Sequence, residues 1–310
     1  MYDLIILGAG PAGLSASIYA SRYKINHIVI GNIFDSSTSK AHLLENWPGE
    51  KSIKGLDLVN NFSDHAKTLG VDIFQENAVE IIKEVDSDSE KNIFTIKTGL
   101  DKVYQAESIL MALGTKHRKL NIPGEEEFLG KGVSYCAVCD SAFFKEKIVA
   151  VVGGSNSAAM ATMMLSEHAS KVYLIYRKKP LRCEPIMIDR LEKNEKVEII
   201  YNTNVIKVSG EKKVEEIELD SEYNESKKIK LDGLFIEAGS IPSASLIKEL
   251  EMKTDDSGYV VIDQSGATNI RGVYAAGDIT NGSNGLRQIV TATSEGAIAA
   301  TSIYKYLKEK

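Results

Sequence analysis

Two of the three cysteines in this 310-residue sequence lie together, in SYCAVCD at 134–140. Cys136 and Cys139 are three positions apart and Asp140 follows them, which leaves half a zinc site, a stabilising disulfide, chance or a redox-active dithiol open. A structural zinc site needs four ligands, but Cys183 is alone and the histidines are scattered singly. A disulfide closing so short a loop adds only about 2 kcal/mol. The spacing therefore favours a dithiol that cycles between its reduced and oxidised forms.

A glycine-rich turn near the start of the chain has the surroundings of a dinucleotide-binding motif. The apolar run DLIIL at 3–7 is followed by the turn GAGPAG at 8–13, then by a helical pattern, and then by a second apolar run, HIVIG at 27–31. In such a unit Gly8 permits the tight turn, Gly10 lets the backbone approach a pyrophosphate, and Gly13 lets the helix pack closely on the strand. Free N–H groups at the helix start would bind the phosphate.

The same order recurs directly after the cysteine pair. KIVAVV at 147–152 predicts a buried strand, GGSNSA at 153–158 the turn, the next residues a helix, and KVYLIYR at 171–177 a second strand. The sequence therefore predicts two nucleotide-binding units, with the dithiol just before the second.

A basic cluster closes the second strand of the second unit. Arg177, Lys178 and Arg182 stand where an NAD site would have an acidic residue, and the sequence offers no competing acid among them. Arginine suits bidentate phosphate contacts and lysine supplies a point charge, so we expect the 2′-phosphate of NADPH here. A flavin is then the natural occupant of the first unit, because it can take a hydride from NADPH and pass electrons to a disulfide.

Further strands are predicted near 196–206, 213–219 and 229–236, and the hydrophilic stretch 218–228 is interpreted as a surface hairpin turn between the last two. RGVYAAGDIT at 271–280 precedes a helix predicted from about Gln288 to Leu307. The expected fold class is α/β, with two Rossmann-like, three-layer ββα nucleotide-binding domains, the second inserted in the first. We place an FAD-binding domain at 1–115 plus 245–310 and an NADPH-binding domain carrying the dithiol at 116–244, with crossings in 114–119 and 239–243.

Composition narrows the partners and the compartment. A net charge of −6 argues against nucleic acid, and no apolar run reaches the roughly 18 residues of a membrane span. MYDLIILGAG lacks the features of a signal peptide, and three cysteines do not form a disulfide framework. We therefore expect a cytoplasmic protein with neither a nucleic-acid nor a membrane partner and no bound metal.

Several motifs together resemble the low-molecular-weight thioredoxin reductases of the class-II pyridine nucleotide-disulfide oxidoreductase family, over essentially the whole chain. They are GAGPAG, ENWPG at 45–49, CAVCD at 136–140, GGSNSA, YRKKPLR at 176–182, AAGD at 275–278 and RQIVTATSEGAIAA at 287–300. The resemblance implies that Cys139 is nearest the flavin, that Cys136 attacks the thioredoxin disulfide, and that Asp140 serves as the acid–base group. It also implies a homodimer whose NADPH domain rotates so that the dithiol alternately faces the flavin and the protein substrate.

The resemblance supplies candidate contacts for both cofactors. For FAD they are Gly8, Gly10, Pro11, Ala12, Gly13, Asn46, Gly277, Asp278 (on a ribitol hydroxyl), Arg287, Gln288 and Ile289. For NADPH they are Gly153, Gly154, Asn156, Ser157, Arg177, Lys178 and Arg182. Trp47 is expected to pack under the core of the flavin domain, and Cys183 to be packed rather than reactive.

Three positions depart from the family pattern. Ser155 replaces the third turn glycine, Tyr176 and Lys178 replace a histidine and an arginine, and DSSTSK at 35–40 replaces a segment rich in Gly-Gly-Gln. The leading hypothesis is electron transfer from NADPH through FAD and the dithiol to a thioredoxin-like protein. The alternatives are the same reductase fed by ferredoxin or another donor, a flavin dithiol oxidase acting on a small metabolite with oxygen, and a non-enzymatic flavin-binding redox sensor.

Overall fold

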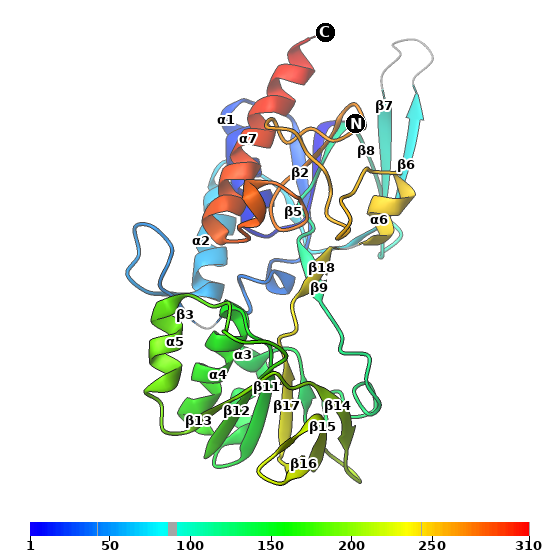
Figure 1. The fold of residues 1–310 in the computed structure, drawn as a ribbon. Coiled ribbons are helices and arrows are strands. Elements are labelled where there is room, and N and C mark those ends of the chain that lie inside the picture. Colours follow the sequence, from blue (N-terminus) through cyan, green and yellow to red (C-terminus); the bar gives the residue numbers. More distant parts are fainter. Residues whose placement is uncertain (42, 86–91, 243, 310) are drawn as a thin grey trace. The chain divides into compact units, whose positions relative to one another are not determined.

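The computed structural model describes residues 1–41, 43–85, 92–242 and 244–309. The chain divides into two compact units, Met1–Lys116 with Ile241–Lys310, and His117–Ser240 (Figure 1). Where the chain passes between the units, the short strands β9 (Thr115–His117) and β18 (Ser240–Pro242) pair with each other. The second unit is therefore inserted in the first.

The first unit is built on a sheet with the strand order β5-β2-β1-β8-β7-β6, and β19 pairs with β8. Strands β1, β2, β5 and β19 run parallel to their neighbours, whereas β6, β7 and β8 form an antiparallel meander. The elements are β1 (Tyr2–Leu7), α1 (Pro11–Arg22), β2 (His27–Ile30), η1 (Ile33–Asp35), β3 (Leu43–Leu44), β4 (Ile53–Lys54), α2 (Gly55–Thr68), β5 (Ile73–Phe74), β6 (Ala78–Val85), β7 (Asn92–Thr98), β8 (Val103–Met111), α6 (Ala244–Glu249), β19 (Val273–Ala275), η3 (Ser283–Gly285) and α7 (Ile289–Lys308).

Two hydrophobic clusters lie on opposite faces of this sheet. On one face α1, α2 and α7 contribute Leu14, Val59 and Ala299 among others. On the other face Phe94 of β7 and Leu246 of α6 pack with residues of the central strands. Strand β1 is apolar along its last four residues because it is covered on both faces, as parallel strands usually are.

The second unit has a parallel sheet of order β10-β17-β11-β12-β13 and an antiparallel sheet β14-β15-β16. Helices α4 and α5 pack on one face of the parallel sheet, and the antiparallel sheet packs on the other. The elements are β10 (Val133–Ser134), α3 (Ala137–Asp140), η2 (Ser141–Phe144), β11 (Ile148–Val152), α4 (Asn156–His168), β12 (Lys171–Tyr176), α5 (Pro185–Glu192), β13 (Val197–Tyr201), β14 (Val205–Ser209), β15 (Glu216–Tyr223), β16 (Ser226–Lys230) and β17 (Gly233–Ile236).

Both units therefore combine parallel strands, helices on one face and antiparallel strands, which confirms the predicted α/β class with its three layers. Helix α7 begins and ends within a residue of its prediction. Among the residues described, no helix is long and apolar enough to cross a membrane.

Two predicted strands and one turn are wrong in detail. The run 196–206 is two strands, because the chain turns at Asn202 (φ 53°) and β14 leaves the parallel sheet for the antiparallel one. The run 229–236 likewise divides into β16 and β17. The hairpin turn is only two residues long: Asn224 and Glu225 both have positive φ, the geometry that joins tightly paired strands.

The helices α1 and α7 pack closely through a glycine. A Cβ atom at Gly296 would overlap the backbone carbonyl of Ala12, which is fixed in the first turn of α1. The contact therefore holds α7 against the helix that follows the first glycine turn.

We expect Gly296→Ala to lower the stability of the first unit by about 1–3 kcal/mol, because an added methyl group in a tight helix contact forces backbone shifts. Thermal unfolding measures the change. In Gly99→Ala a Cβ meets only ordinary contacts, so this control variant should unfold near the wild-type temperature. Equal stability of the two variants would contradict the packing argument.

Candidate functional site

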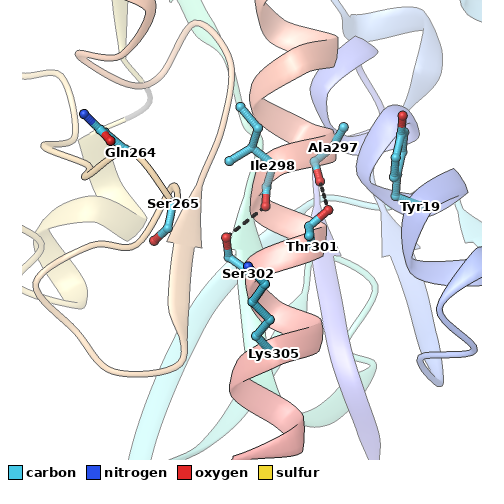
Figure 2. Close-up of a pocket in the computed structure, with 8 residues that line it drawn as sticks. All are labelled: Tyr19, Gln264, Ser265, Ala297, Ile298, Thr301, Ser302 and Lys305. Carbon is cyan, nitrogen blue, oxygen red and sulfur yellow. Dashed lines mark hydrogen bonds between the residues drawn. The ribbon is translucent and has the colours of Figure 1, made fainter.

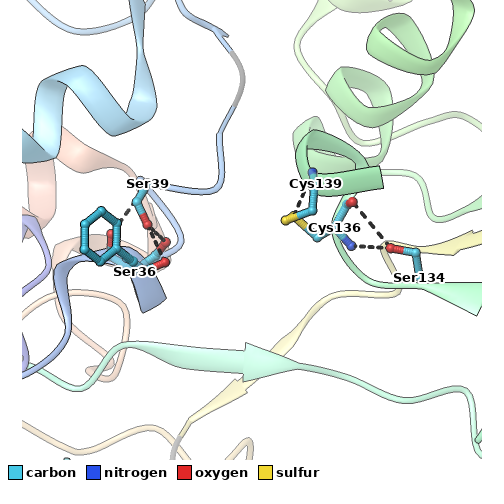
Figure 3. The surroundings of a disulfide bond; sticks show 6 residues. Ser36, Ser39, Ser134, Cys136 and Cys139 are labelled. Carbon is cyan, nitrogen blue, oxygen red and sulfur yellow. Dashed lines mark hydrogen bonds between the residues drawn. A yellow bond between two sulfur atoms is a disulfide. The ribbon is translucent and has the colours of Figure 1, made fainter. Parts of the chain in front are cut away.

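Cys136 and Cys139 form a disulfide, with their Cα atoms 5.3 Å apart, at the start of α3 (Figure 3). The hydroxyl of Ser134 accepts a hydrogen bond from the Cys136 N–H at 3.0 Å. The N–H of Cys139 donates to Sγ of Cys136 at 3.2 Å. Cys136 is half-buried and Cys139 exposed. The pair is thus oxidised, accessible and held by backbone hydrogen bonds at its first cysteine.

A buried carboxylate anchors the chain before the disulfide. Glu125 is 2% exposed and accepts a hydrogen bond of 2.5 Å from the hydroxyl of Tyr135, the residue preceding Cys136. The same carboxylate accepts hydrogen bonds from the backbone N–H groups of Leu120, Asn121 and Ile122. Burial and the contact with Glu125 raise the pKa of Tyr135, so the phenol stays a donor. Glu125 therefore ties the segment before the disulfide to residues 120–122.

The first glycine turn leads into a helix start that no side chain caps. The N-cap of α1 is Gly10, which has no side chain to bond the first N–H groups, and Pro11 occupies the first helical turn. A Cβ at Gly13 would overlap the Gly8 carbonyl, so only glycine lets the helix come this close. The free N–H groups at this end fit the phosphates of a dinucleotide.

Just before α7 the guanidinium of Arg287 is only partly satisfied: its Nη1 donates to the Gly285 carbonyl at 3.4 Å, and Asp278, in the loop after β19, is desolvated by burial. The Nε atom of Arg287 is buried without a hydrogen bond, and its guanidinium lies 3.6 Å from the ring centroid of Tyr259. Burial raises the pKa of Asp278, against the opposing charge of Arg287. Nearby, the Asn46 side-chain amide donates to Gln288 at 3.0 Å. These unsatisfied polar groups fit a bound FAD, which offers hydroxyl and carbonyl groups to pair with them.

Glu295 is a residue of this region that the sequence did not single out. Its carboxylate accepts hydrogen bonds from the Gly277 N–H at 2.8 Å, the Thr280 hydroxyl at 2.9 Å and the Ser283 hydroxyl at 2.6 Å. One side chain on α7 thus shapes the loop that carries Asp278. An acid within the small apolar residues of SEGAIAA was the available signal.

The second glycine turn also precedes an uncapped helix, with Ser155 as the N-cap of α4. A Cβ at Gly154 would overlap the ring of Tyr176, which is 5% exposed. Tyr176, which stands in place of the family's histidine, is therefore a core residue that packs beneath the turn. The Arg182 N–H donates to the Gly154 carbonyl at 2.6 Å, which brings the end of the basic segment to the turn.

The candidate cations Arg177, Lys178 and Arg182 are exposed at the end of β12 and beyond. An acid just beyond this cluster contacts another of the NADPH candidates. Two hydrogen bonds join Asn156 and Glu184. The Asn156 side-chain amide donates to the Glu184 carboxylate at 3.2 Å, and the Glu184 backbone N–H donates to the Asn156 side-chain oxygen at 2.8 Å. Two residues after Arg182, the chain folds this acid back onto α4, which linear spacing did not reveal.

A second acid that the sequence did not single out follows β17. The backbone N–H of Glu237 donates to the carbonyl of Val152 at 2.8 Å, and a Cβ at Gly153 would overlap the Glu237 carbonyl. Glu237 therefore lies directly beside the second glycine turn. Burial raises the pKa of its carboxyl to about 7. An acidic residue directly after a fully buried parallel strand was the signal for it.

Other candidates have structural environments. Cys183 is buried in the α-helical side of the second unit, and burial raises the pKa of its thiol, which confirms a packed cysteine. Trp47 is half-buried, with its ring edge-on to Phe62 of α2 at 5.3 Å. Among the described residues, no three His, Cys, Asp or Glu side chains are grouped as metal ligands.

A pocket of about 480 Å³ lies along α7, and none of the predicted site residues lines it (Figure 2). Its lining residues are Tyr19, Gln264, Ser265, Ala297, Ile298, Thr301, Ser302 and Lys305. The hydroxyls of Thr301 and Ser302 donate to carbonyls of their own helix at 2.8 and 3.0 Å. The pocket thus has no acid, thiol or imidazole with which to do chemistry.

The architecture and the paired cysteines define a class of protein. The model of the pyridine nucleotide-disulphide oxidoreductase family matches residues 2–296, and the chain belongs to this family. Its cofactors are accordingly FAD and NADPH, and it is an oxidoreductase.

Within the family, the chain is similar to thioredoxin reductases. It is 41% identical to that of Listeria innocua over 312 aligned positions, covering 100% of this chain and 95% of the relative. The crystal structure of Lactococcus lactis thioredoxin reductase in its FR conformation is 33% identical, covers 100% of both chains and superposes with a TM-score of 0.92. A ferredoxin-flavin thioredoxin reductase of Clostridium acetobutylicum is 31% identical, with 100% and 99% coverage and a TM-score of 0.53.

The raised pKa of Glu237 predicts a pH-dependent contribution to stability. Between about pH 4.5 and 7 the folded protein binds this proton and the unfolded chain does not, so the contribution falls as pH rises, by up to about 3 kcal/mol. Glu237→Gln removes the effect. The variant should therefore gain in melting temperature over the wild type from pH 5 to pH 8.

Thermal scans across that pH range, on the full chain, measure the difference. Glu167→Gln changes an exposed carboxylate at the other end of α4 and should give a curve parallel to that of the wild type. A parallel curve for Glu237→Gln as well would show that the folded-state pKa is ordinary.

Proposed function

We propose that this protein is a thioredoxin reductase. When bound, NADPH and FAD would supply the two electrons that convert the Cys136–Cys139 disulfide to a dithiol, and this dithiol reduces a thioredoxin-like protein. The observation that carries the proposal is the disulfide itself, accessible at the start of α3 in the same unit as the second glycine turn. In sum, NADPH, one proton and the partner's disulfide give NADP⁺ and the partner's dithiol, so two electrons balance.

The local hydrogen bonds support different roles for the two cysteines. After reduction, the Cys139 N–H that now contacts Cys136 Sγ would stabilise a thiolate on Cys136. Cys136 then attacks the partner's disulfide and forms a mixed disulfide. Cys139 next attacks Cys136, which restores the internal disulfide and releases the partner as a dithiol. Asp140, in the same turn as Cys139, is the proposed acid–base group for the proton transfers.

The two cofactors are assigned to different units. For FAD, the uncapped start of α1 would hold the pyrophosphate, and Asp278 and the Arg287–Gln288–Ile289 segment would contact the rest of the molecule. For NADPH, the start of α4 would hold the pyrophosphate, with Arg177, Lys178 and Arg182 toward the 2′-phosphate. The helix starts and unpaired polar atoms described above support both assignments.

An exposed aromatic side chain supports a protein rather than a small-molecule acceptor. Phe143, in the turn after α3, is 71% exposed, and Val138 between the cysteines is 36% exposed. Apolar groups beside a reactive disulfide suit contact with a partner's surface. We further expect a homodimer acting in the cytoplasm, as the resemblance implied.

A ferredoxin-fed reductase is the second candidate. The similarity to the Clostridium acetobutylicum enzyme favours it, as does the burial of Tyr176, which removes one contact from the proposed 2′-phosphate site. In that case the same dithiol would act, but the second glycine turn would bind NADPH weakly or not at all.

Anaerobic titration of the holoprotein with NADPH, followed by oxidised thioredoxin, tests the proposal. Flavin absorbance should bleach at stoichiometric NADPH and return on addition of thioredoxin. In Cys136→Ser the NADPH step should persist, while turnover with thioredoxin falls roughly a thousandfold or more because the attacking thiol is missing.

Cys183→Ala is the matched control, since it removes the buried thiol of the same unit and should leave both steps unchanged. If the flavin stays oxidised with NADPH but is reduced by ferredoxin, the electron donor is ferredoxin and not NADPH. A reduced protein that fails to reduce thioredoxin, yet consumes oxygen with a small dithiol, would support the oxidase instead.

A further inference from the structure

Glu237 is half-buried and differs from Glu125 and Glu76, the two almost fully buried glutamates among the described residues. Glu125 accepts four hydrogen bonds, and Glu76 accepts hydrogen bonds from the Thr98 hydroxyl and the Lys102 ammonium. Within the described part of the chain, the Glu237 carboxyl has neither a hydrogen bond nor an ion pair, and burial alone shifts its pKa. A half-buried carboxylate without a protein partner has lost part of its hydration, and a ligand that pairs with it recovers that loss.

The strand order places Glu237 on a defined side of the nucleotide site. The chain runs from β11 to β12 and β13 in one direction across the sheet, whereas β17 pairs on the opposite side of β11. Nucleotides bind across the carboxyl ends of parallel strands at such a reversal. With the adenosine end at the basic residues that follow β12, the nicotinamide end would lie on the β17 side of β11, where Glu237 stands.

The register supports this placement at the level of single residues. Val152 at the end of β11 pairs with Ile236 at the end of β17, so Gly153 and Glu237 leave the sheet side by side. The turn that approaches the pyrophosphate and the acid are thus adjacent, on the side away from β12.

We propose that Glu237 is a specificity-determining residue that binds the nicotinamide end of the pyridine nucleotide and favours the oxidised ring over the reduced one. This inference rests on the proposed function, because it requires NADPH in the second unit. NADPH, when bound, supplies a hydride, which is two electrons and one proton, and its ring is left with a positive charge. The carboxylate stabilises that charge, whereas the neutral reduced ring gains nothing from it.

Binding of three ligands to the oxidised holoprotein, measured by calorimetry at pH 8.5, tests the proposal. NADP⁺ has the cationic ring, tetrahydro-NADP has a neutral ring that cannot give a hydride, and adenosine 2′,5′-bisphosphate has no nicotinamide. Glu237→Gln should weaken NADP⁺ roughly tenfold and change the other two less than twofold. Glu237→Asp keeps the charge and should retain most of the preference for NADP⁺.

Glu167→Gln is the control variant and should bind all three ligands like the wild type. An unchanged affinity of Glu237→Gln for NADP⁺, or an equal loss for all three ligands, would overturn the role of Glu237. So would a Glu237→Asp variant that behaves like Glu237→Gln. If the wild type binds none of the three, it is the proposed NADPH donor that fails, and ferredoxin becomes the donor to test.

Discussion

Both units depend on the same constraint: a helix must begin immediately beyond a buried parallel strand, with its first N–H groups unpaired. α1 and α4 each start at a residue whose side chain makes no capping bond. Such ends are stable only with water or an anion at them. Glycines in the turns let the backbone come close to an anion, so the fold itself, rather than added side chains, supplies donors that suit one.

The rest of the first unit can be understood as support for one of these ends. α7 packs on α1 through Gly296, and from the same helix Glu295 fixes the loop carrying Asp278. A flexible loop with an unpaired acid would adopt many conformations, and ordering it on binding would reduce affinity. Three hydrogen bonds to one carboxylate remove that freedom in advance. Helix α7 therefore holds in place the start of α1 and the loop that carries Asp278.

The sequence predicted the parts that local patterns determine. The strands at 27–30, 148–152 and 171–176 are largely apolar runs because both their faces are covered. It misplaced the strands in 196–206, because alternation says which residues face a core and not which sheet the strand joins. Glu295 and Glu184 were missed since each pairs with backbone or side chains that folding alone brings near.

The pairing of β9 with β18 has a consequence for how the two units are connected. Neighbouring strands lie about 5 Å apart, so the two ends of the first unit, at residues 116 and 241, lie next to each other. A hairpin loop of a few residues would span that distance, and the sheet and helices of the first unit would remain complete without the second unit. The dithiol-bearing unit is therefore, in its connections, an insertion at a single loop of the first.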